Sequence, residues 1–185
     1  MRRFRKTALA LHIIITISFI VACNNMDDSV ARLKQKIDKA EMVEYIDSVH
    51  LTTVKMLYPD FFSVKKENGQ RAEFYYSDQD VKELVLSFHA IPPRIFENTE
   101  KALKIISDSL DICIKKRSDY FILKSEESDP SSFVLLTKYY RTKFGGWICV
   151  SILYEKKYEK AVTRLTKQVM KWKPLSDKLF PDMPD

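Results

Sequence analysis

Several segments of the chain carry apolar residues at the three- and four-residue spacing of an amphipathic helix. A helix is expected from Val30, with Asp28 or Ser29 as its capping residue, to a break near 39–41. A second helix follows and ends at Pro59. Its apolar stripe is Val43, Ile46, His50, Val54 and Leu57.

Three further helices are predicted downstream. One covers 81–88, after a segment at 77–80 that resembles a capping box, and the next lies between Pro93 and Leu110. The last, over 155–172, has the clearest pattern. Its apolar stripe is Tyr158, Ala161, Val162, Leu165, Val169 and Trp172.

The remaining apolar segments are rich in β-branched and aromatic residues and predict strands. Segment 61–76 is expected to form a hairpin around Asn68-Gly69, because a type I′ turn needs positive φ at both central positions. In the last hairpin, a two-residue turn would set Ile148 opposite Lys143. A three-residue turn would set it opposite Thr142, which matches the faces better and is preferred. A four-strand antiparallel meander is predicted over 112–116, 120–124, 133–143 and 147–154.

This order of elements predicts an α+β fold in which helices pack on an antiparallel sheet made of a hairpin and a four-strand meander. The order over about 30–154 resembles the NTF2-like cone, and the C-terminal amphipathic helix would be an addition to it. The predicted organisation is a signal peptide at 1–22, a lipidated Cys and tether at 23–29, a single domain at 30–179 and a flexible tail at 180–185.

The N-terminal segment has the features of an export signal. Four basic residues precede an apolar block of 16 residues, Thr7–Ala22, which is shorter than the ~20 residues that span a bilayer. The block ends in Ile20-Val21-Ala22-Cys23, which resembles the lipobox of bacterial lipoproteins. The resemblance implies cleavage before Cys23, a diacylglycerol on its thiol and an acylated amine. The alternatives are an uncleaved anchor or a secretory signal with a chance Cys.

The residues that follow Cys23 bear on where such a lipoprotein would reside. Asn24 is not the Asp of the inner-membrane retention rule, and the paired acids Asp27 and Asp28 resemble the surface-export signal of Bacteroidetes lipoproteins. We therefore expect a lipid-anchored protein of the cell envelope, in the outer membrane, on its periplasmic face or at the cell surface. The membrane is then a partner through the N-terminal lipid.

Charge and composition change this picture only slightly. The full chain carries 31 Lys and Arg against 25 Asp and Glu, a net charge of +6 that would be compatible with nucleic-acid binding. Without the four basic residues of the signal the net charge is +2, and an exported protein is not expected to bind nucleic acid. Only three Gly are present, too few for the glycine-rich loops that cradle phosphates.

Two cysteines remain after lipidation of Cys23. Cys113 and Cys149 both lie on predicted strands, in what would be an oxidising compartment. They either form a disulfide or are two buried thiols that never meet, and both alternatives stay open.

Asp47 and His50 are the candidate catalytic pair. Three residues apart on the predicted helix, they could act as an acid–base dyad. His50 also falls on the apolar stripe, where a hydrogen-bonded core histidine is the favoured alternative. No metal-ligand spacing and no cofactor motif is found, so neither a metal nor a cofactor is predicted.

The predicted terminal helix is strongly basic, with seven basic and two acidic residues over 155–173. A basic amphipathic helix can bind anionic lipid or an acidic partner. The favoured alternative is an ordinary helix that packs its stripe on the sheet and exposes lysines to water. The candidate interaction face consists of Lys156, Lys157, Lys160, Arg164, Lys167 and Lys171.

The sequence therefore predicts a membrane-tethered envelope lipoprotein that acts as a non-catalytic binding or interaction module for a protein or a small ligand. The lipobox-like segment and the lack of a catalytic motif favour this hypothesis. One alternative is an NTF2-like hydrolase or isomerase that uses His50 and Asp47. Another is an immunity or inhibitor lipoprotein that occupies a partner's surface.

Overall fold

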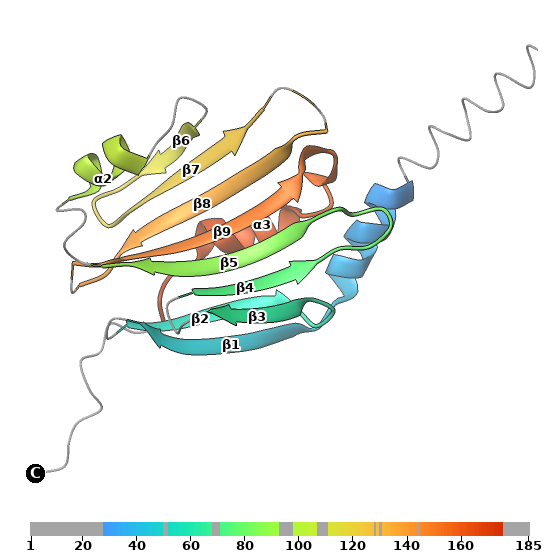
Figure 1. The fold of residues 1–185 in the computed structure, drawn as a ribbon, viewed down its shortest axis with the longest axis horizontal. Helices are drawn as coiled ribbons and strands as arrows, with labels where there is room; N and C mark the ends of the chain where they lie inside the picture. Colours follow the sequence, from blue (N-terminus) through green and yellow to red (C-terminus); the bar gives the residue numbers. More distant parts are fainter. Residues whose placement is uncertain are drawn as a thin grey trace, which may run out of the picture.

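The computed structural model describes residues 28–49, 52–67, 71–92, 98–106, 111–127, 129, 131–143 and 145–175, and these residues form an α+β domain (Figure 1). Within them, strands β1 and β2 form a separate hairpin, and seven further strands form an antiparallel sheet in the order β3-β4-β5-β9-β8-β7-β6. The strands are β1 (Met42–Val49), β2 (Thr52–Pro59), β3 (Ser63–Glu67), β4 (Arg71–Tyr76), β5 (Leu84–Ile91), β6 (Asp111–Lys116), β7 (Tyr120–Glu126), β8 (Phe133–Arg141) and β9 (Trp147–Glu155). The helices are one across 28–39, α2 (Thr99–Ile106), the 3-10 turn η1 (Lys156–Tyr158) and α3 (Thr163–Lys171).

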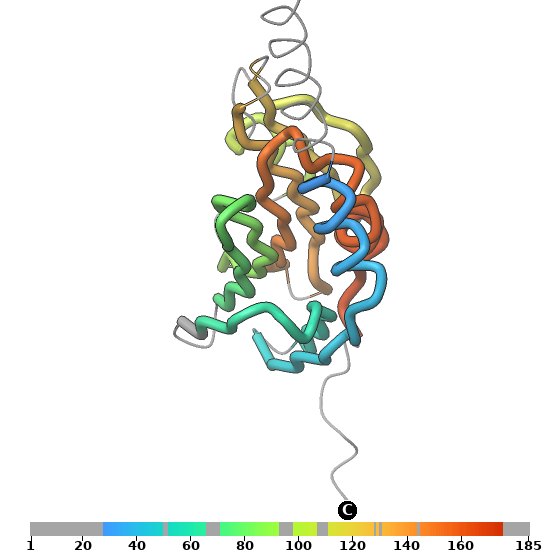
Figure 2. Tube along the Cα trace, turned by 90° about the vertical axis from the view of Figure 1, so that its right-hand side faces the viewer, coloured from blue at the N-terminus to red at the C-terminus, as the bar shows by residue number. Residues whose placement is uncertain are grey.

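One face of the large sheet is covered by α3, by the helix across 28–39 and by the β1–β2 hairpin. The two helices lie side by side (Figure 2), and Arg164 Nη1 on α3 donates a hydrogen bond to the carbonyl of Ile37, 2.7 Å away. The hairpin packs through aromatic contacts: the Tyr58 ring stacks on Phe74 with centroids 4.5 Å apart. The helices and the hairpin thus form a second layer over the sheet.

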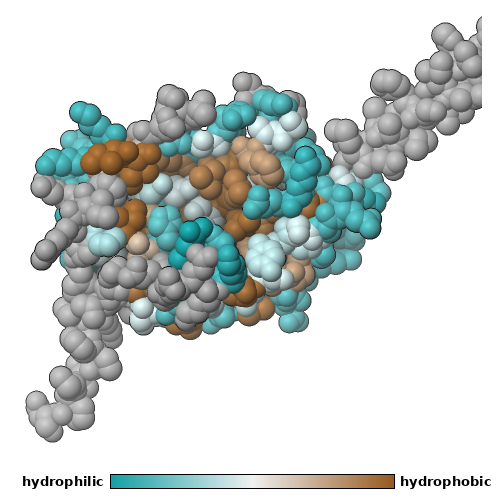
Figure 3. Space-filling model, viewed as in Figure 1, coloured by the Kyte–Doolittle hydropathy of each residue, from teal (hydrophilic) through white to brown (hydrophobic). Residues whose placement is uncertain are grey.

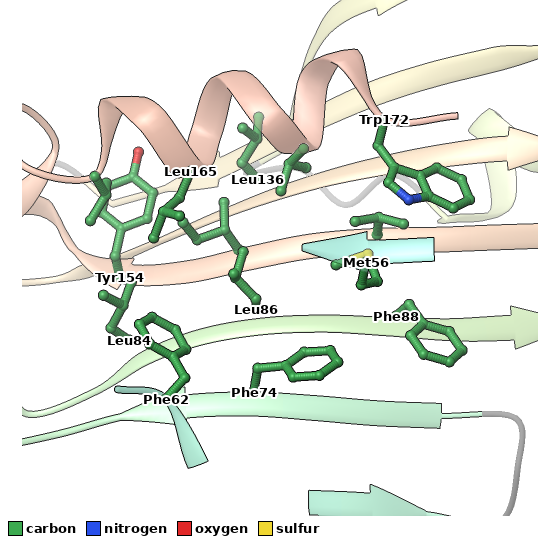
Figure 4. Close-up of a cluster of buried hydrophobic side chains, with 14 of the residues drawn as sticks. Met56, Phe62, Phe74, Leu84, Leu86, Phe88, Leu136, Tyr154, Leu165 and Trp172 are labelled. Atoms are coloured by element: carbon green, nitrogen blue, oxygen red, sulfur yellow. The ribbon is translucent and has the colours of Figure 1, made fainter. Parts of the chain in front are cut away.

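The main hydrophobic core lies between these two layers (Figure 4). Alternate residues of β5, Leu84, Leu86 and Phe88, point into it and are at most 1% exposed. Leu165 of α3 and Met56 of β2 close the core from the opposite side. Burial of each such side chain contributes about 1.5–3 kcal/mol, so this layer contact accounts for much of the domain's stability.

The opposite face of the sheet is covered only in part. Helix α2 packs there, and its Ala102 joins Phe121, Leu123 and Trp147 in a second buried cluster. Beyond α2, hydrophobic side chains of the described residues are visible at the surface of this face (Figure 3). Leu135 on β8 remains 40% exposed and Phe133 37% exposed.

Much of the predicted element pattern is confirmed. The α+β class, the hairpin within 61–76 (β3 and β4) and the antiparallel meander (β6 to β9) are all observed. All six stripe positions of the predicted terminal helix are buried. That helix begins later than expected, however, because Glu155 ends β9, where its buried carboxylate accepts a hydrogen bond of 2.9 Å from the Lys82 N–H.

Two predicted helices are wrong. The segment with the stripe from Val43 to Leu57 forms β1 and β2, which pair from Met42 opposite Pro59 to Val49 opposite Thr52. The segment 81–88 leads into β5, which lies between β4 and β9. The segment 77–80 does not cap a helix: Asp78 Oδ1 accepts hydrogen bonds from the N–H groups of Asp80 and Val81 and closes a turn before the strand.

Both errors arise because the apolar positions fit the period of a helix as well as that of a strand. In β2 the buried positions Thr52, Val54 and Met56 alternate with half-buried ones, which is the period of a strand. In β5 apolar residues lie on both faces, as is typical of a strand with neighbours on both sides. The element order behind the resemblance to the NTF2-like cone is therefore not the observed one. Asn68-Gly69 and the tail 180–185 lie outside the described residues.

The predicted register of the last hairpin is also wrong. Ile148 pairs with Tyr140, and Arg141 with Trp147, so that residues 142–146 connect the strands. The Thr142 N–H donates to the Gly146 carbonyl at 2.8 Å, and Gly145 has a φ of 85°. Relative to the preferred three-residue turn, the register is shifted by two residues, which keeps every side chain on its expected face.

Candidate functional site

The candidate catalytic pair does not have the predicted geometry. Asp47 lies on strand β1, so the helical three-residue spacing that would have set it beside His50 is absent. Its carboxylate is engaged locally: Oδ2 accepts from the Tyr45 hydroxyl at 3.0 Å and Oδ1 from the Ser48 N–H at 2.8 Å. His50 lies outside the described residues.

Cys113 and Cys149 do not form a disulfide. Both are free thiols, Cys113 exposed on β6 and Cys149 buried on β9. Two strands, β8 and β7, lie between β9 and β6. At about 4.8 Å per strand the two cysteines are more than 14 Å apart across the sheet, far beyond the 7 Å limit between Cα atoms. Burial raises the pKa of the Cys149 thiol, which keeps it protonated. Cys23 lies outside the described residues.

The predicted basic interaction face divides into two groups. Lys156 donates to the Glu127 carbonyl at 2.9 Å, Lys157 lies 3.5 Å from the Glu155 carboxylate, and Arg164 donates to carbonyls at the end of the helix across 28–39. These three therefore have structural partners. Lys160, Lys167 and Lys171 are exposed. Of these, Lys171 lies at the C-terminal end of α3, where the surface is hollowed.

This hollow is a groove of about 450 Å³ between strand β2 and the end of α3. Its apolar part comes from Leu57, Trp172, Pro174 and Leu175, and its polar part from Gln168 and three lysines. The lysines are Lys55, Lys171 and Lys173. The groove lies at the far end of α3 from the helix across 28–39, where the described chain begins (Figure 1).

Hydrogen bonds to the β2 backbone join the two sides of the groove. The Trp172 indole N–H donates to the Lys55 carbonyl at 2.8 Å, and the Gln168 amide donates to the Leu57 carbonyl. The Leu175 N–H then donates to the Thr53 carbonyl at 3.0 Å. The chain after α3 is thus fixed beside the first residues of β2. It leaves the helix there because Pro174 cannot continue it and the residue before a proline favours an extended backbone.

A buried lysine supports the groove from inside. Lys138 on β8 is 2% exposed, and its ammonium donates to the carbonyls of Met170 at 3.1 Å and Trp172 at 2.7 Å. These carbonyls belong to the last turn of α3, where a helix favours a cation. Burial lowers the pKa of Lys138 to about 8, and the nearby ammonium groups of Lys173 and Lys115 add to this effect against the opposing carboxylate of Asp119.

The electrostatic balance of the groove is positive. Lys55 forms an ion pair with Glu44, whereas Lys171 and Lys173 are exposed at the groove. An apolar floor beside ammonium groups suits a ligand that has an anionic group and an apolar part. The sequence indicated Lys171 but gave no signal for Lys55 or Leu57, because a residue on β2 meets α3 only in the folded domain.

Two features that often mark a function are not found in the part of the chain that the structure covers. No group of three or more His, Cys, Asp and Glu side chains there is arranged to hold a metal ion. No helix among the described residues has the length and apolar character needed to cross a membrane.

The fold class is that of an α+β domain with helices on an antiparallel sheet. Comparison by sequence finds no protein family and no curated protein that matches this chain. Among solved structures, the Ran-binding protein Mog1p of Saccharomyces cerevisiae is similar over 71% of this chain and 94% of its own, at 9% identity and a TM-score of 0.46. PA94 from Pseudomonas aeruginosa, a protein of unknown function, is similar over 78% of this chain and 99% of its own, at 10% identity and a TM-score of 0.39.

Proposed function

We propose that the protein is a lipid-anchored protein of the cell envelope whose folded domain is a non-catalytic binding module. Its ligand is an anionic molecule with an apolar part, such as a long-chain carboxylate, held in the groove at the end of α3. The observation that carries this proposal is the combination in one groove of about 450 Å³ of lysines with Leu57, Trp172 and Leu175.

The size and chemistry of the groove support a small amphiphile. A volume of this order is within the range of ligand pockets, which runs from about 300 to 1,000 Å³. Leu175 is 57% exposed, and covering it with an acyl chain would remove apolar surface from water. The carboxylate would form charge-assisted hydrogen bonds with Lys171 or Lys173.

The tether is the second part of the proposal, and the lipobox-like segment Ile20-Val21-Ala22-Cys23 supports it. Residues 1–27 lie outside the described residues, so the anchor remains a prediction from sequence. The described chain begins at the helix across 28–39, at the end of the molecule away from the groove (Figure 1). A short lipid tether at Cys23 would therefore leave the groove unobstructed.

Binding is tested by adding dodecanoate, below its micelle concentration, to the purified protein and following the tryptophan fluorescence, to which Trp172 at the groove and Trp147 outside it both contribute. We expect a saturable change that Lys171→Glu together with Lys173→Glu weakens at least about tenfold, since each lost charge pair contributes about 1 kcal/mol. The matched control is Lys160→Glu with Lys167→Glu, two exposed lysines outside the groove, which should bind as the parent does. Equal weakening by both double variants would show only non-specific charge attraction and would refute the groove as the site.

The anchor is tested separately. The intact mass of the protein extracted from envelopes should show acyl chains on Cys23, and Cys23→Ser should release the protein from the membrane. An unmodified product that begins at Met1 would disprove the lipoprotein assignment without affecting the groove.

A further inference from the structure

The C-terminal segment, residues 176–185, begins at the edge of the groove. Leu175 lines the groove, and its N–H donates to the Thr53 carbonyl at 3.0 Å, which fixes the point where the described chain leaves it. The segment itself lies outside the described residues. Ten extended residues span at most about 35 Å, whereas Thr53 to Leu57 covers only about 13 Å along β2. The segment is therefore long enough to turn back and cover the groove.

The sequence of this segment has the chemistry that suits the groove. It contains three acids and one lysine, a net charge of −2, together with three large apolar residues. The acids are Asp177, Asp182 and Asp185, and the apolar residues are Leu179, Phe180 and Met183. Ser176 and Asp177 are residue types that favour turns. A turn directly after Leu175 would bring the adjacent apolar pair back over the groove.

The groove offers groups that such a segment complements. Within the part of the chain that the structure describes, no acid pairs with Lys171 or Lys173, which line the groove, whereas Lys55 is paired with Glu44. Leu175 keeps 57% of its surface exposed beside them. An apolar side chain laid on Leu175 would remove apolar surface from water, and an aspartate beside either lysine would form charge-assisted hydrogen bonds.

We propose that the C-terminal segment turns back and occupies the groove of its own chain, in competition with the anionic ligand. Leu179 and Phe180 lie on the apolar floor, and the aspartates of the segment face Lys171 and Lys173. The occupant is this segment because it starts at the groove, carries the opposite charge and has apolar residues that match the floor. The regulatory consequence rests on the proposed function, since the segment and the ligand share one site.

Self-occupancy sets a threshold for ligand binding. A group joined to its site by a short flexible linker has an effective concentration in the millimolar range. With an effective concentration of about 4 mM and an intrinsic dissociation constant of about 1 mM for the segment, the apparent affinity for the ligand falls about fivefold. The groove therefore admits a ligand only when its concentration is high enough to displace the segment.

Photo-cross-linking of the full chain in intact cells tests where the segment lies. Benzoylphenylalanine is placed at position 180, and on irradiation its ketone carbon bonds to a nearby carbon while the oxygen takes that carbon's hydrogen. We expect a link within one chain to peptides that contain Leu57 or Gln168, which line the groove far from Phe180 in sequence. The same group at Ile105, which is 66% exposed on α2 across the sheet, is the control and should not link to these peptides. Links from position 180 only to other regions, only to a second copy or to no protein would overturn the proposal.

Dodecanoate binding, followed by tryptophan fluorescence, tests the competition. Leu179→Ser with Phe180→Ser should tighten dodecanoate binding about fivefold, because the segment loses the side chains that hold it on the apolar floor. Ile105→Ser with Ile112→Ser changes two exposed apolar residues outside the groove, and this matched control should bind as the parent does. Circular dichroism checks that each variant is folded. Equal affinity of the parent and the segment variant would overturn the competition.

The two measurements separate this proposal from the choice of ligand. If no variant binds dodecanoate but position 180 still links to the groove, the ligand is wrong and the self-occupancy stands. If the parent and the segment variant bind dodecanoate equally and position 180 does not link to the groove, the ligand stands and the self-occupancy is wrong. In the segment variant, Lys171→Glu with Lys173→Glu reports on the ligand alone, because the segment no longer competes.

Discussion

Lys138→Met removes a buried ammonium from the interior and leaves an unbranched side chain in its place. The ammonium lies over the Tyr120 ring, 4.3 Å from its centroid, and donates to two carbonyls at the end of α3. Burial lowers the pKa of this lysine from an ordinary 10.5 to about 8. The variant therefore tests whether the charge at this position costs free energy.

The pH dependence follows from the difference between the folded and unfolded states. The unfolded chain holds the proton up to a pH near 10.5, whereas the folded protein releases it near 8, so the unfolded state binds more protons in between. The free energy of unfolding of the parent should therefore rise with pH across this range. At ~1.4 kcal/mol for each pH unit, the gain relative to Lys138→Met is about 3 kcal/mol.

The assay is urea unfolding of the parent and of Lys138→Met at several pH values between 7 and 11, followed by circular dichroism. The difference between the two proteins removes the effect of the other lysines and tyrosines, which titrate in both. Lys160→Met, at an exposed lysine, is the control and should show no pH-dependent difference from the parent. A flat difference for Lys138→Met would refute the reasoning, because it would show that the two carbonyls compensate fully for burial.

Three further outcomes are expected. Phe88→Ala should lower the free energy of unfolding by about 3–5 kcal/mol and Ile46→Ala by less than ~0.5 kcal/mol, because the first side chain is fully buried and the second is 56% exposed; equal losses in urea unfolding would contradict the assigned core. Arg164→Leu should speed amide exchange in the helix across 28–39 without unfolding the sheet, since Arg164 donates to carbonyls at the end of that helix; unchanged exchange there would show that the contact is dispensable. A maleimide should modify Cys113 in the native protein and Cys149 only after unfolding, as peptide mapping would show; rapid native labelling of Cys149 would contradict its burial.

The strands of the meander were predictable because their signal is local. Segments from Asp111 to Glu155 are rich in β-branched and aromatic residues and are separated by short polar turns, so sequence neighbours became sheet neighbours. The stripe of the terminal helix was equally clear, and its residues from Tyr158 to Trp172 are buried where the pattern required.

The segments that failed were those whose state depends on distant partners. Leu84, Leu86 and Phe88 could have faced a core from a helix or a strand, and their pairing with β4 and β9 decided for a strand. The register of the β8–β9 hairpin was decided by its five-residue connection, 142–146. The sequence analysis considered only turns of two and three residues.

The candidate site shows the same division. The sequence by itself determined the basic character of the terminal helix, and it predicts an export signal with a lipobox-like end. Only the tertiary structure decided which of those lysines face solvent, that Lys55 and Leu57 join Lys171 in one groove, and that β6 is an edge strand. The physical reason is that residue type and local spacing are written along the chain, whereas burial and the pairing of distant strands arise from packing that no single segment specifies.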